Sequence, residues 1–405
     1  MKKTVLFVVA MISLSAVVQS CHKDNNSNKV IKVYNVSGLF SLTGNGSTLG
    51  INSKAAVSIA VTDINNYLYA KNADFRMSAD FYDTQFEPAT AAQDFAKAAA
   101  GGTHYIIGPQ TSAELGAINT LADPDGVIVV SQGSTASSLA IAGDAVFRFC
   151  PPDKVEGAAI ANSIYKAGVR GLVTLARNDA GNLGLQTATG SSFTTLGGHI
   201  SALAAYGTTA TDFTAQIALL HSQVTQLAAT YGMANVAVYL ASFEECTELF
   251  QQAAADPVIS KVRWYGGDGA VLSAALTAVP TAADFAIATS FYAPTFGLPA
   301  ALKAKWQPIS DLVTAATNIQ PDAFALSTYD AMWVIEKTIE VSENKNVTFT
   351  QLKANFAEQA NAYTGITGPT ALDQNGDRAG GVFDYYGLLK TGSTYSWTLV
   401  GQSGN

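Results

Sequence analysis

Four loops, each following a short apolar segment, concentrate the residue types that could bind a small molecule. The first covers residues 41–50, SLTGNGSTLG, and offers glycines and hydroxyl groups that could surround a phosphate. It matches neither GxGxxG nor GxxxxGK(S/T) and contains no lysine, so the pattern argues against a nucleotide site. A loop whose glycines adopt positive φ angles is the simpler interpretation.

Two further loops, residues 107–112 (IGPQTS) and 131–135 (SQGST), place hydroxyl side chains where helices are expected to begin. Unpaired N–H groups and the helix dipole attract a carboxylate at such positions. For either loop alone, simple N-capping by Ser112 or Thr135 is the alternative. Two such loops on neighbouring strands favour an anion site.

The fourth loop, Gly266-Gly267-Asp268-Gly269, follows an apolar segment in the second half of the chain. Asp268 is either a turn residue, a common role beside glycines, or a lone carboxylate offered to a cation. Hydroxyl and N–H groups in one half of the protein and a carboxylate in the other would suit a zwitterion.

Short β-branched segments alternate with longer helical patterns from residue 30 onward. The expected strands cover 30–39, 75–82, 104–107, 126–130, 171–176, 234–241, 261–265, 285–291, 382–389 and 395–400, with another near His199. The expected helices cover 53–67, 89–99, 112–121, 244–254, 302–316 and 321–341, with a long helix from Asp212. This alternation predicts an α/β fold with two doubly wound, Rossmann-like lobes built on parallel sheets. Such sheets bind ligands beyond the carboxyl ends of their strands, where the four loops lie.

The composition excludes several classes of protein. The chain has 405 residues, 48% of them apolar and 13% charged, with a net charge of −8. The apolar content excludes disorder, and the acidic balance argues against a nucleic-acid partner. Three cysteines and four scattered histidines leave no disulfide framework and no recognisable metal motif. No cofactor is expected.

The amino terminus has the features of an export signal. Residues 1–20 combine two lysines with an apolar stretch too short for a stable membrane span. The segment ends Val18-Gln19-Ser20-Cys21, which resembles the lipobox of bacterial lipoproteins and implies lipidation of Cys21. A plain signal peptide with an incidental cysteine is the alternative. Residues 21–29 are polar and are expected to form a flexible tether.

In an oxidising compartment, Cys150 and Cys246 could form a disulfide. Cys150 falls in a strand-like segment and Cys246 in a helix-like one, so two separate buried thiols are the favoured interpretation.

Nine segments, taken in order, resemble the type I periplasmic solute-binding proteins of the branched-chain amino acid and amide (Leu/Ile/Val-binding) family. These segments are SLTG at 41–44, AVTDIN at 60–65, Asp83 with PATA at 88–91, IGP at 107–109, SQGST at 131–135, Phe147-Arg148 with Pro151 and Asp153, Tyr329-Asp330-Ala331, GITG at 365–368, and DQNGD at 373–377. The likeness covers nearly all of the chain after the signal segment.

The resemblance implies two interleaved lobes joined by a hinge of three crossover strands, near 151–154, 289–292 and 368–372. Lobe 1 would comprise residues 30–152 and 291–369, and lobe 2 would comprise 153–290 and 370–405. It also implies a monomeric, exported lipoprotein, anchored in the periplasm or at the cell surface, that delivers a small amino acid or amide to an ABC permease. A ligand-sensing receptor or scaffold with the same fold is the alternative function.

The resemblance also implies roles for particular residues. Ser112, Gly133 and Thr135 would hold the ligand's α-carboxylate, and Asp268 would hold its α-ammonium. Phe243 would cover the ligand, and Leu49 would form the wall against its side chain.

One loop departs from the family. Residues 177–184 (RNDAGNLG) lack the aromatic residue that the family usually has there. Arg177 or Asn182 could add polar contacts in its place.

Other acidic residues do not form a catalytic set. Asp373, Asn375, Asp377 and Asp384 occupy positions of a calcium-loop template, but Arg378 stands where that template has glycine, so a solvated turn is favoured. Glu244 and Glu245 are adjacent, and neighbours on a helix point apart. No GxSxG elbow accompanies the serines and histidines. We therefore expect a binding protein rather than an enzyme, and no metal site.

Overall fold

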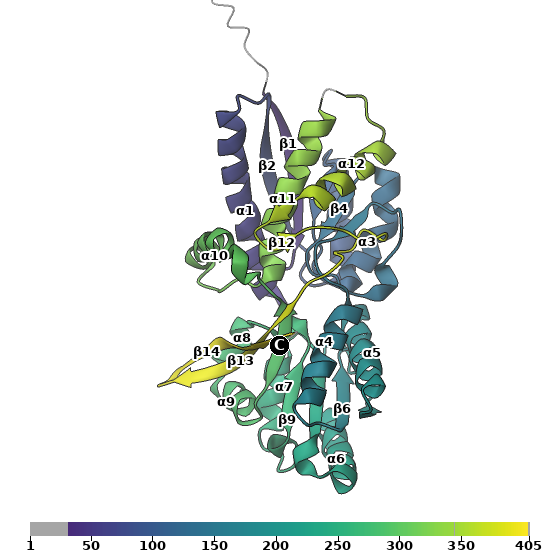
Figure 1. Ribbon diagram of the computed structural model, residues 1–405, viewed down its shortest axis with the longest axis vertical. Helices are drawn as coiled ribbons and strands as arrows, with labels where there is room; N and C mark the ends of the chain where they lie inside the picture. The colour runs from purple at the N-terminus through teal and green to yellow at the C-terminus, as the bar shows by residue number, and fades with distance from the viewer. Residues whose placement is uncertain (1–30, 344, 404–405) are drawn as a thin grey trace, which may run out of the picture.

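The computed structural model describes residues 31–343 and 345–403, which form two separate β-sheets flanked by helices (Figure 1). The predicted signal peptide, the tether and Cys21 lie outside the described residues. We call the part built on the first sheet lobe 1 and the part built on the second sheet lobe 2.

Lobe 1 contains a five-stranded parallel sheet with the strand order β2-β1-β3-β4-β5. Its strands are β1 (Lys32–Phe40), β2 (Phe75–Asp83), β3 (Tyr105–Ile107), β4 (Ile128–Ser131) and β5 (Val146–Arg148). Its helices are α1 (Ser47–Ala70), α2 (Pro88–Ala100), α3 (Ser112–Asp125), α10 (Lys303–Thr317), α11 (Ala323–Ser342) and α12 (Phe349–Ala362). A two-stranded ribbon, β11 (Thr364–Gly365) with β12 (Gly368–Pro369), lies beside α11.

Lobe 2 contains a seven-stranded sheet with the strand order β14-β13-β10-β9-β8-β6-β7. Its strands are β6 (Gly171–Ala176), β7 (His199–Ala202), β8 (Val236–Ala241), β9 (Arg263–Gly266), β10 (Tyr292–Phe296), β13 (Phe383–Thr391) and β14 (Thr394–Gln402). Its helices are α4 (Asp153–Lys166), α5 (Ala180–Thr195), α6 (Thr214–Tyr231), α7 (Cys246–Ala253), α8 (Ala274–Ala278) and α9 (Pro280–Ala288). Short 3₁₀ turns occur at Ser137–Leu139, Met233–Asn235, Ile259–Lys261, Asp268–Ala270 and Ala300–Leu302.

Each sheet has an apolar core on both of its faces, because successive strand residues point to opposite sides. In β3, Ile107 packs with α1 and α11 on one face, while Ile106 packs with α2 and α3 on the other. In β6, Val173 packs in one core of lobe 2, and Leu172 packs in a second core on the other face of the sheet. This arrangement confirms the predicted α/β fold with two doubly wound lobes.

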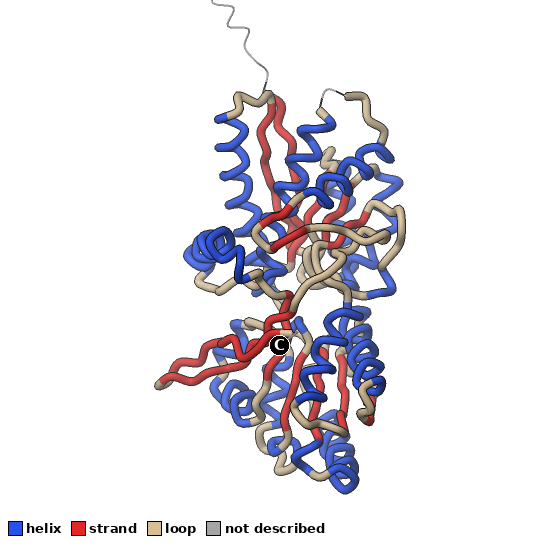
Figure 2. The backbone as a smooth tube through the Cα atoms, viewed as in Figure 1, coloured by secondary structure: helices blue, strands red, loops and turns tan. Residues whose placement is uncertain are grey.

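The C-terminal end of the chain departs from the parallel pattern. Strands β13 and β14 form an antiparallel hairpin that extends β10 at the edge of the second sheet and projects from the lobe (Figure 2). Antiparallel edge strands on otherwise parallel sheets are common.

Several predicted boundaries change. A strand was predicted at 285–291, but α9 continues to Ala288 and the strand β10 begins at Tyr292. Pro280 at the first position of α9 and the small, buried Ala282, Ala283 and Ala286 explain the helix. Because β10 pairs with β9 and β13, residues 292–296 belong to the sheet of lobe 2, not to lobe 1 as predicted. The helix α12 was not predicted.

A buried ion pair joins the returning C-terminal segment to lobe 1. Arg148 Nε lies 2.5 Å from Asp377 Oδ1, and Arg148 Nη2 lies 2.6 Å from Asp377 Oδ2. Residues 373–378 were predicted to form a solvated turn, but Asp377 and Arg378 are only 2% and 3% exposed. The turn itself is present, since the Asp373 carboxylate accepts the N–H groups of Asn375 and Asp377.

The two cysteines of the described chain are separate. Cys150 and Cys246 are buried free thiols, as predicted. Among residues 31–343 and 345–403, no helix has the length and apolar character needed to cross a membrane.

We expect Asp377→Ala to lower the free energy of unfolding by about 3–5 kcal/mol, because it leaves the Arg148 guanidinium buried and unpaired. Urea denaturation followed by circular dichroism measures this change. Asp284→Ala is the matched control, since it removes a carboxylate from an exposed ion pair with Lys390. Equal effects of the two substitutions would contradict the role given to the buried pair.

Candidate functional site

A cavity lies between the two lobes, at the carboxyl ends of the parallel strands. The centre of a water molecule can occupy a volume of about 60 Å³ inside this cavity. The structure brings all the residues predicted to bind ligand to its wall, namely Leu49, Ser112, Gly133, Thr135, Phe243 and Asp268. The wall also contains residues to which the sequence analysis gave no role, among them Phe86, Gln110, Glu244, Asp322 and Phe324.

The N-terminus of α3 forms part of the lobe 1 wall. Its N-cap is Thr111, whose hydroxyl accepts the N–H of Glu114 while the Glu114 carboxylate accepts the N–H of Thr111. Ser112 is therefore the first helical residue, and the alternative that Ser112 caps this helix is wrong. The Ser112 hydroxyl is therefore not used as the helix cap.

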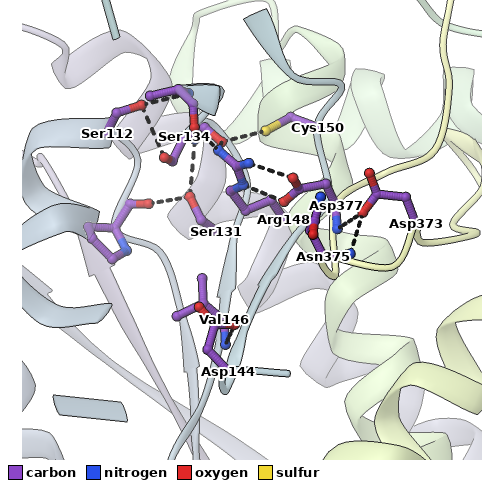
Figure 3. Close-up of polar contacts among 12 residues, drawn as sticks. Ser112, Ser131, Ser134, Asp144, Val146, Arg148, Cys150, Asp373, Asn375 and Asp377 are labelled. Atoms are coloured by element: carbon purple, nitrogen blue, oxygen red, sulfur yellow. Dashed lines mark hydrogen bonds and ion pairs between the residues drawn. The ribbon is translucent and has the colours of Figure 1, made fainter. Parts of the chain in front are cut away.

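The hydroxyl of Ser112 is oriented by the neighbouring loop. Ser112 Oγ accepts hydrogen bonds from the Ser134 hydroxyl and from the Ala136 N–H, both at 3.1 Å (Figure 3). Both contacts use the oxygen as an acceptor, so the Ser112 proton can still be donated to an anion in the cavity.

Arg148 supports that loop from behind. Its Nη1 donates to the carbonyl oxygens of Ser134 (3.2 Å) and Ala136 (2.7 Å), while its other nitrogens bind Asp377 (Figure 3). The sequence analysis quoted Arg148 only as part of a family motif. Its position links the C-terminal segment at Asp377 to the loop that carries Gly133 and Thr135.

The glycine-rich segment at 41–50 packs closely against the site, and its last four residues form the first turn of α1 rather than part of the predicted loop. Gly44 and Gly46 have φ angles of 75° and 82°, which confirms the interpretation that this loop needs positive φ. A Cβ at Gly50 would lie 1.9 Å from the Ser41 carbonyl oxygen. Gln110 Nε2 donates to the Gly46 carbonyl at 2.8 Å and so connects this loop with the α3 loop.

Asp268 lies on the lobe 2 wall, in the 3₁₀ turn that follows β9. Its N–H donates to Glu156 Oε1 at 3.0 Å. Burial raises the pKa of Asp268 to about 7, and the nearby charge of Asp153 also raises it. Burial also raises the pKa of Glu156, and the nearby charge of Asp268 raises it further. Burial raises the pKa of Asp153 to about 7.

Two aromatic rings meet across the cleft. Phe86, from the loop after β2, and Phe243, from the loop after β8, form an edge-to-face pair with centroids 4.7 Å apart. The Arg177 guanidinium lies 5.3 Å from the Phe86 ring and 5.6 Å from the Phe243 ring. Phe86 therefore supplies an aromatic surface where the loop at 177–184 has none. The position of Phe86 just after a strand was the sequence signal for its role.

The polar residues of the loop at 177–184 bond mainly to one another. Asp179 caps α5 through the N–H of Asn182 and accepts from Arg177 Nε at 2.9 Å. Asn182 lines the cavity, and Arg177 stands behind it in contact with Glu245 at 3.6 Å.

Within the part of the chain that the structure describes, no group of three or more His, Cys, Asp or Glu side chains is placed to hold a metal ion. Lobe 1 offers hydroxyl and N–H donors together with the Asp322 carboxylate, and lobe 2 offers the carboxylates of Asp268 and Glu244. Such a site can bind and orient a small molecule.

Comparison with known proteins identifies the class. The family model described as the receptor family ligand binding region matches residues 52–391, so the chain belongs to this family. It is a family of binding proteins rather than of enzymes, and the fold is that of type I periplasmic binding proteins.

Three solved structures illustrate the likeness. The leucine-binding protein LivK from Thermotoga maritima is 21% identical, with a TM-score of 0.72 over 91% of this chain and 98% of that chain. LivJ from Streptococcus pneumoniae, in complex with isoleucine, is 19% identical, with a TM-score of 0.69 over 91% and 99%. A solute-binding protein from R. palustris, in complex with benzoate, is 18% identical, with a TM-score of 0.70 over 91% and 96%. The fold is thus that of ABC transporter substrate-binding proteins for amino acids or aromatic acids.

We expect Asp153→Asn to lower the pKa of Asp268 from about 7, because it removes a neighbouring negative charge. Titration of ¹³C-labelled carboxyl groups by NMR, with Asp268→Asn to assign the signal, measures the change. The exposed Asp284→Asn should leave the Asp268 titration where it is. An unchanged pKa in the Asp153 variant would contradict this account of the site.

Proposed function

We propose that the protein captures a small amino acid or a related amide between its lobes, as the substrate-binding component of an ABC-type importer. In this proposal Ser112, Gly133 and Thr135 receive the α-carboxylate, and Asp268 receives the α-ammonium. The single observation that carries it is the position of Asp268 across the cavity from the α3 N-terminus. A carboxylate facing a set of hydroxyl and N–H donors matches the two charged ends of a zwitterion.

The charges around the cavity favour a zwitterion over a simple organic anion. Asp268, Asp322 and Glu244 line the wall, and no lysine, arginine or histidine is among the lining residues that the structure describes. A benzoate-like anion would meet these carboxylates without a cation of its own to offset them. An ammonium group offsets at least the charge of Asp268.

The apolar residues of the wall indicate the rest of the ligand. Leu49, Leu185, Val271 and Phe324 line the cavity together with the pair of aromatic rings. These surfaces would pack against a small apolar or uncharged side chain, and the small free volume argues against a large one.

The sequence supports export and anchoring as a further part of the proposal. The leader at 1–20 and the lipobox ending at Cys21 would place the mature protein outside the cytoplasmic membrane, tethered by lipid. The polar segment after Cys21 would let the lobes reach a permease.

The family's description as a receptor ligand-binding region favours one second candidate, a sensor that uses the same closure to signal to a membrane partner. Purification of the lipidated protein from membranes, followed by mass spectrometry of its partners, separates the two functions. A permease would support import, and a sensor kinase would support signalling.

Isothermal titration with a panel of amino acids, using benzoate as the anion control, tests the ligand class. We expect Asp268→Asn to weaken amino acid binding at least tenfold, because a charge-assisted hydrogen bond contributes about 1.5–3 kcal/mol. Asp284→Asn should bind as the parent protein does. Tight binding of benzoate without binding of any amino acid would refute the proposal.

The pH dependence of binding gives an independent check. In the free protein Asp268 has a pKa of about 7, and an ammonium group binds its ionised form. Binding therefore expels a proton below pH 7, so affinity should fall about tenfold for each pH unit below that value. It should level off above pH 7, until the ligand's amine loses its own proton. Calorimetry across pH 5–9 would record this profile, and an affinity independent of pH would speak against Asp268 as the ammonium partner.

A further inference from the structure

Three hydrogen bonds cross the cleft beside the cavity, from the loop after β1 and the first turn of α1 in lobe 1 to the loop after β8 in lobe 2. Asn45 Nδ2 donates to Glu245 Oε2 at 2.7 Å. The Gly46 N–H donates to Glu244 Oε2 at 3.2 Å, and the Thr48 hydroxyl donates to Glu244 Oε1. All three acceptors are carboxylate oxygens, which form stronger hydrogen bonds than neutral acceptors do.

Lobe 2 holds Glu245 in position for these contacts. Glu245 Oε1 accepts from the Tyr206 hydroxyl at 2.7 Å and from the Phe243 N–H at 3.2 Å. Arg177 Nη1 lies 3.6 Å from Glu245 Oε2. These contacts all lie within lobe 2, so they orient the Glu245 carboxylate independently of lobe 1.

Lobe 2 also orients Glu244, whose Oε1 lies 3.4 Å from the Ser273 hydroxyl that donates to it. Burial raises the pKa of this carboxyl, and its three hydrogen-bond donors oppose that change. The sequence analysis set the two adjacent glutamates aside because they cannot act as a catalytic pair. Instead, they face the same loop of the other lobe.

An apolar contact also crosses the cleft at this side. Phe86 of lobe 1 packs edge-to-face on Phe243 of lobe 2. A Cβ at Gly46 would lie 2.3 Å from the Phe86 ring, so this position accepts only glycine without displacing the ring.

We propose that Glu244 and Glu245 form a latch with Asn45, Gly46 and Thr48 that sets the fraction of molecules with closed lobes. The inference rests on the proposed function only in that the ligand binds in the cavity between the lobes. Because the two loops belong to different lobes, a hinge rotation that opens the cleft separates them.

The Asn45–Glu245 bond of the latch joins two residues that do not line the cavity, so it stabilises the closed state by the same amount whichever ligand is bound. Apparent affinity is the affinity of the closed form multiplied by the fraction that is closed. A weaker latch must therefore reduce the affinity for every ligand by one common factor. A residue that touches the ligand would change the affinities for different ligands unequally.

The test variant is Asn45→Asp, which replaces the donor by a carboxylate facing Glu245. Asn45 does not line the cavity. We expect the ligand-free protein to open, seen as a larger radius of gyration in small-angle X-ray scattering. We also expect roughly a tenfold loss of affinity, equal for all bound amino acids, as for the loss of a charge-assisted hydrogen bond.

Asn66→Asp is the matched control, since it makes the same change on an exposed position of α1 in the same lobe. Adding Glu245→Gln to Asn45→Asp should restore closure, because the new amide can donate to the new carboxylate. Thr48→Val removes one donor without adding charge and should also increase the radius of gyration of the ligand-free protein. Thermal unfolding checks that each variant folds.

Scattering of Asn45→Asp identical to that of Asn66→Asp would overturn the latch, and so would an affinity loss confined to one ligand. If no amino acid binds the parent protein, the proposed ligand class fails, while scattering of the ligand-free variants still decides the latch.

Discussion

The buried pair between Arg148 and Asp377 is the interaction on which the site depends most directly. One guanidinium binds the carboxylate of the returning C-terminal segment and also two carbonyl oxygens of the loop that orients Ser112. Arg148 is 1% exposed, so neither it nor Asp377 can exchange its partner for water at low cost. The position of the returning C-terminal segment and that of the loop beside Ser112 are therefore set by the same group.

The electrostatics of the cavity follow from an unequal distribution of donors and acceptors. Lobe 1 contributes hydroxyl and N–H groups at the beginning of α3, where the helix dipole favours negative charge. Lobe 2 contributes Asp268, with Glu156 and Asp153 close behind it; burial raises the pKa of all three carboxyls, and the charge of Asp153 further raises the pKa of Asp268 and of Glu156. In the proposed function, these groups receive a ligand that brings one charge of each sign, and Asp268 couples its affinity to pH.

The two lobes also contact each other directly beside the cavity. The carboxylates of Glu244 and Glu245 contact residues about 200 positions away in the chain, and the rings of Phe86 and Phe243 join two further segments of the opposite lobes. In the proposed account, their strength determines how much of the binding free energy is used to close the cleft. The contact between Asn45 and Glu245 can be tested apart from ligand contacts, because neither side chain lines the cavity.

The sequence by itself determined the doubly wound α/β lobes, since β-branched segments and helical periodicity are local patterns that a parallel sheet requires. It also placed four loops at the carboxyl ends of strands, and the structure brings all the proposed ligand residues from them and from the adjoining loops to one cavity. Their contact with a ligand stays a prediction. Local patterns did not reveal the helix at 349–362, or that residues 285–288 continue a helix.

Only the tertiary structure decided which charged residues are buried and what they face. The turn at 373–378 has the composition of a solvated loop, yet the packing of the crossover segments removes Asp377 and Arg378 from water. Glu244 and Phe86 gain their roles from residues of the opposite lobe, far away in the chain. Such pairings depend on how two separately folded sheets meet, and no spacing within a single segment encodes that.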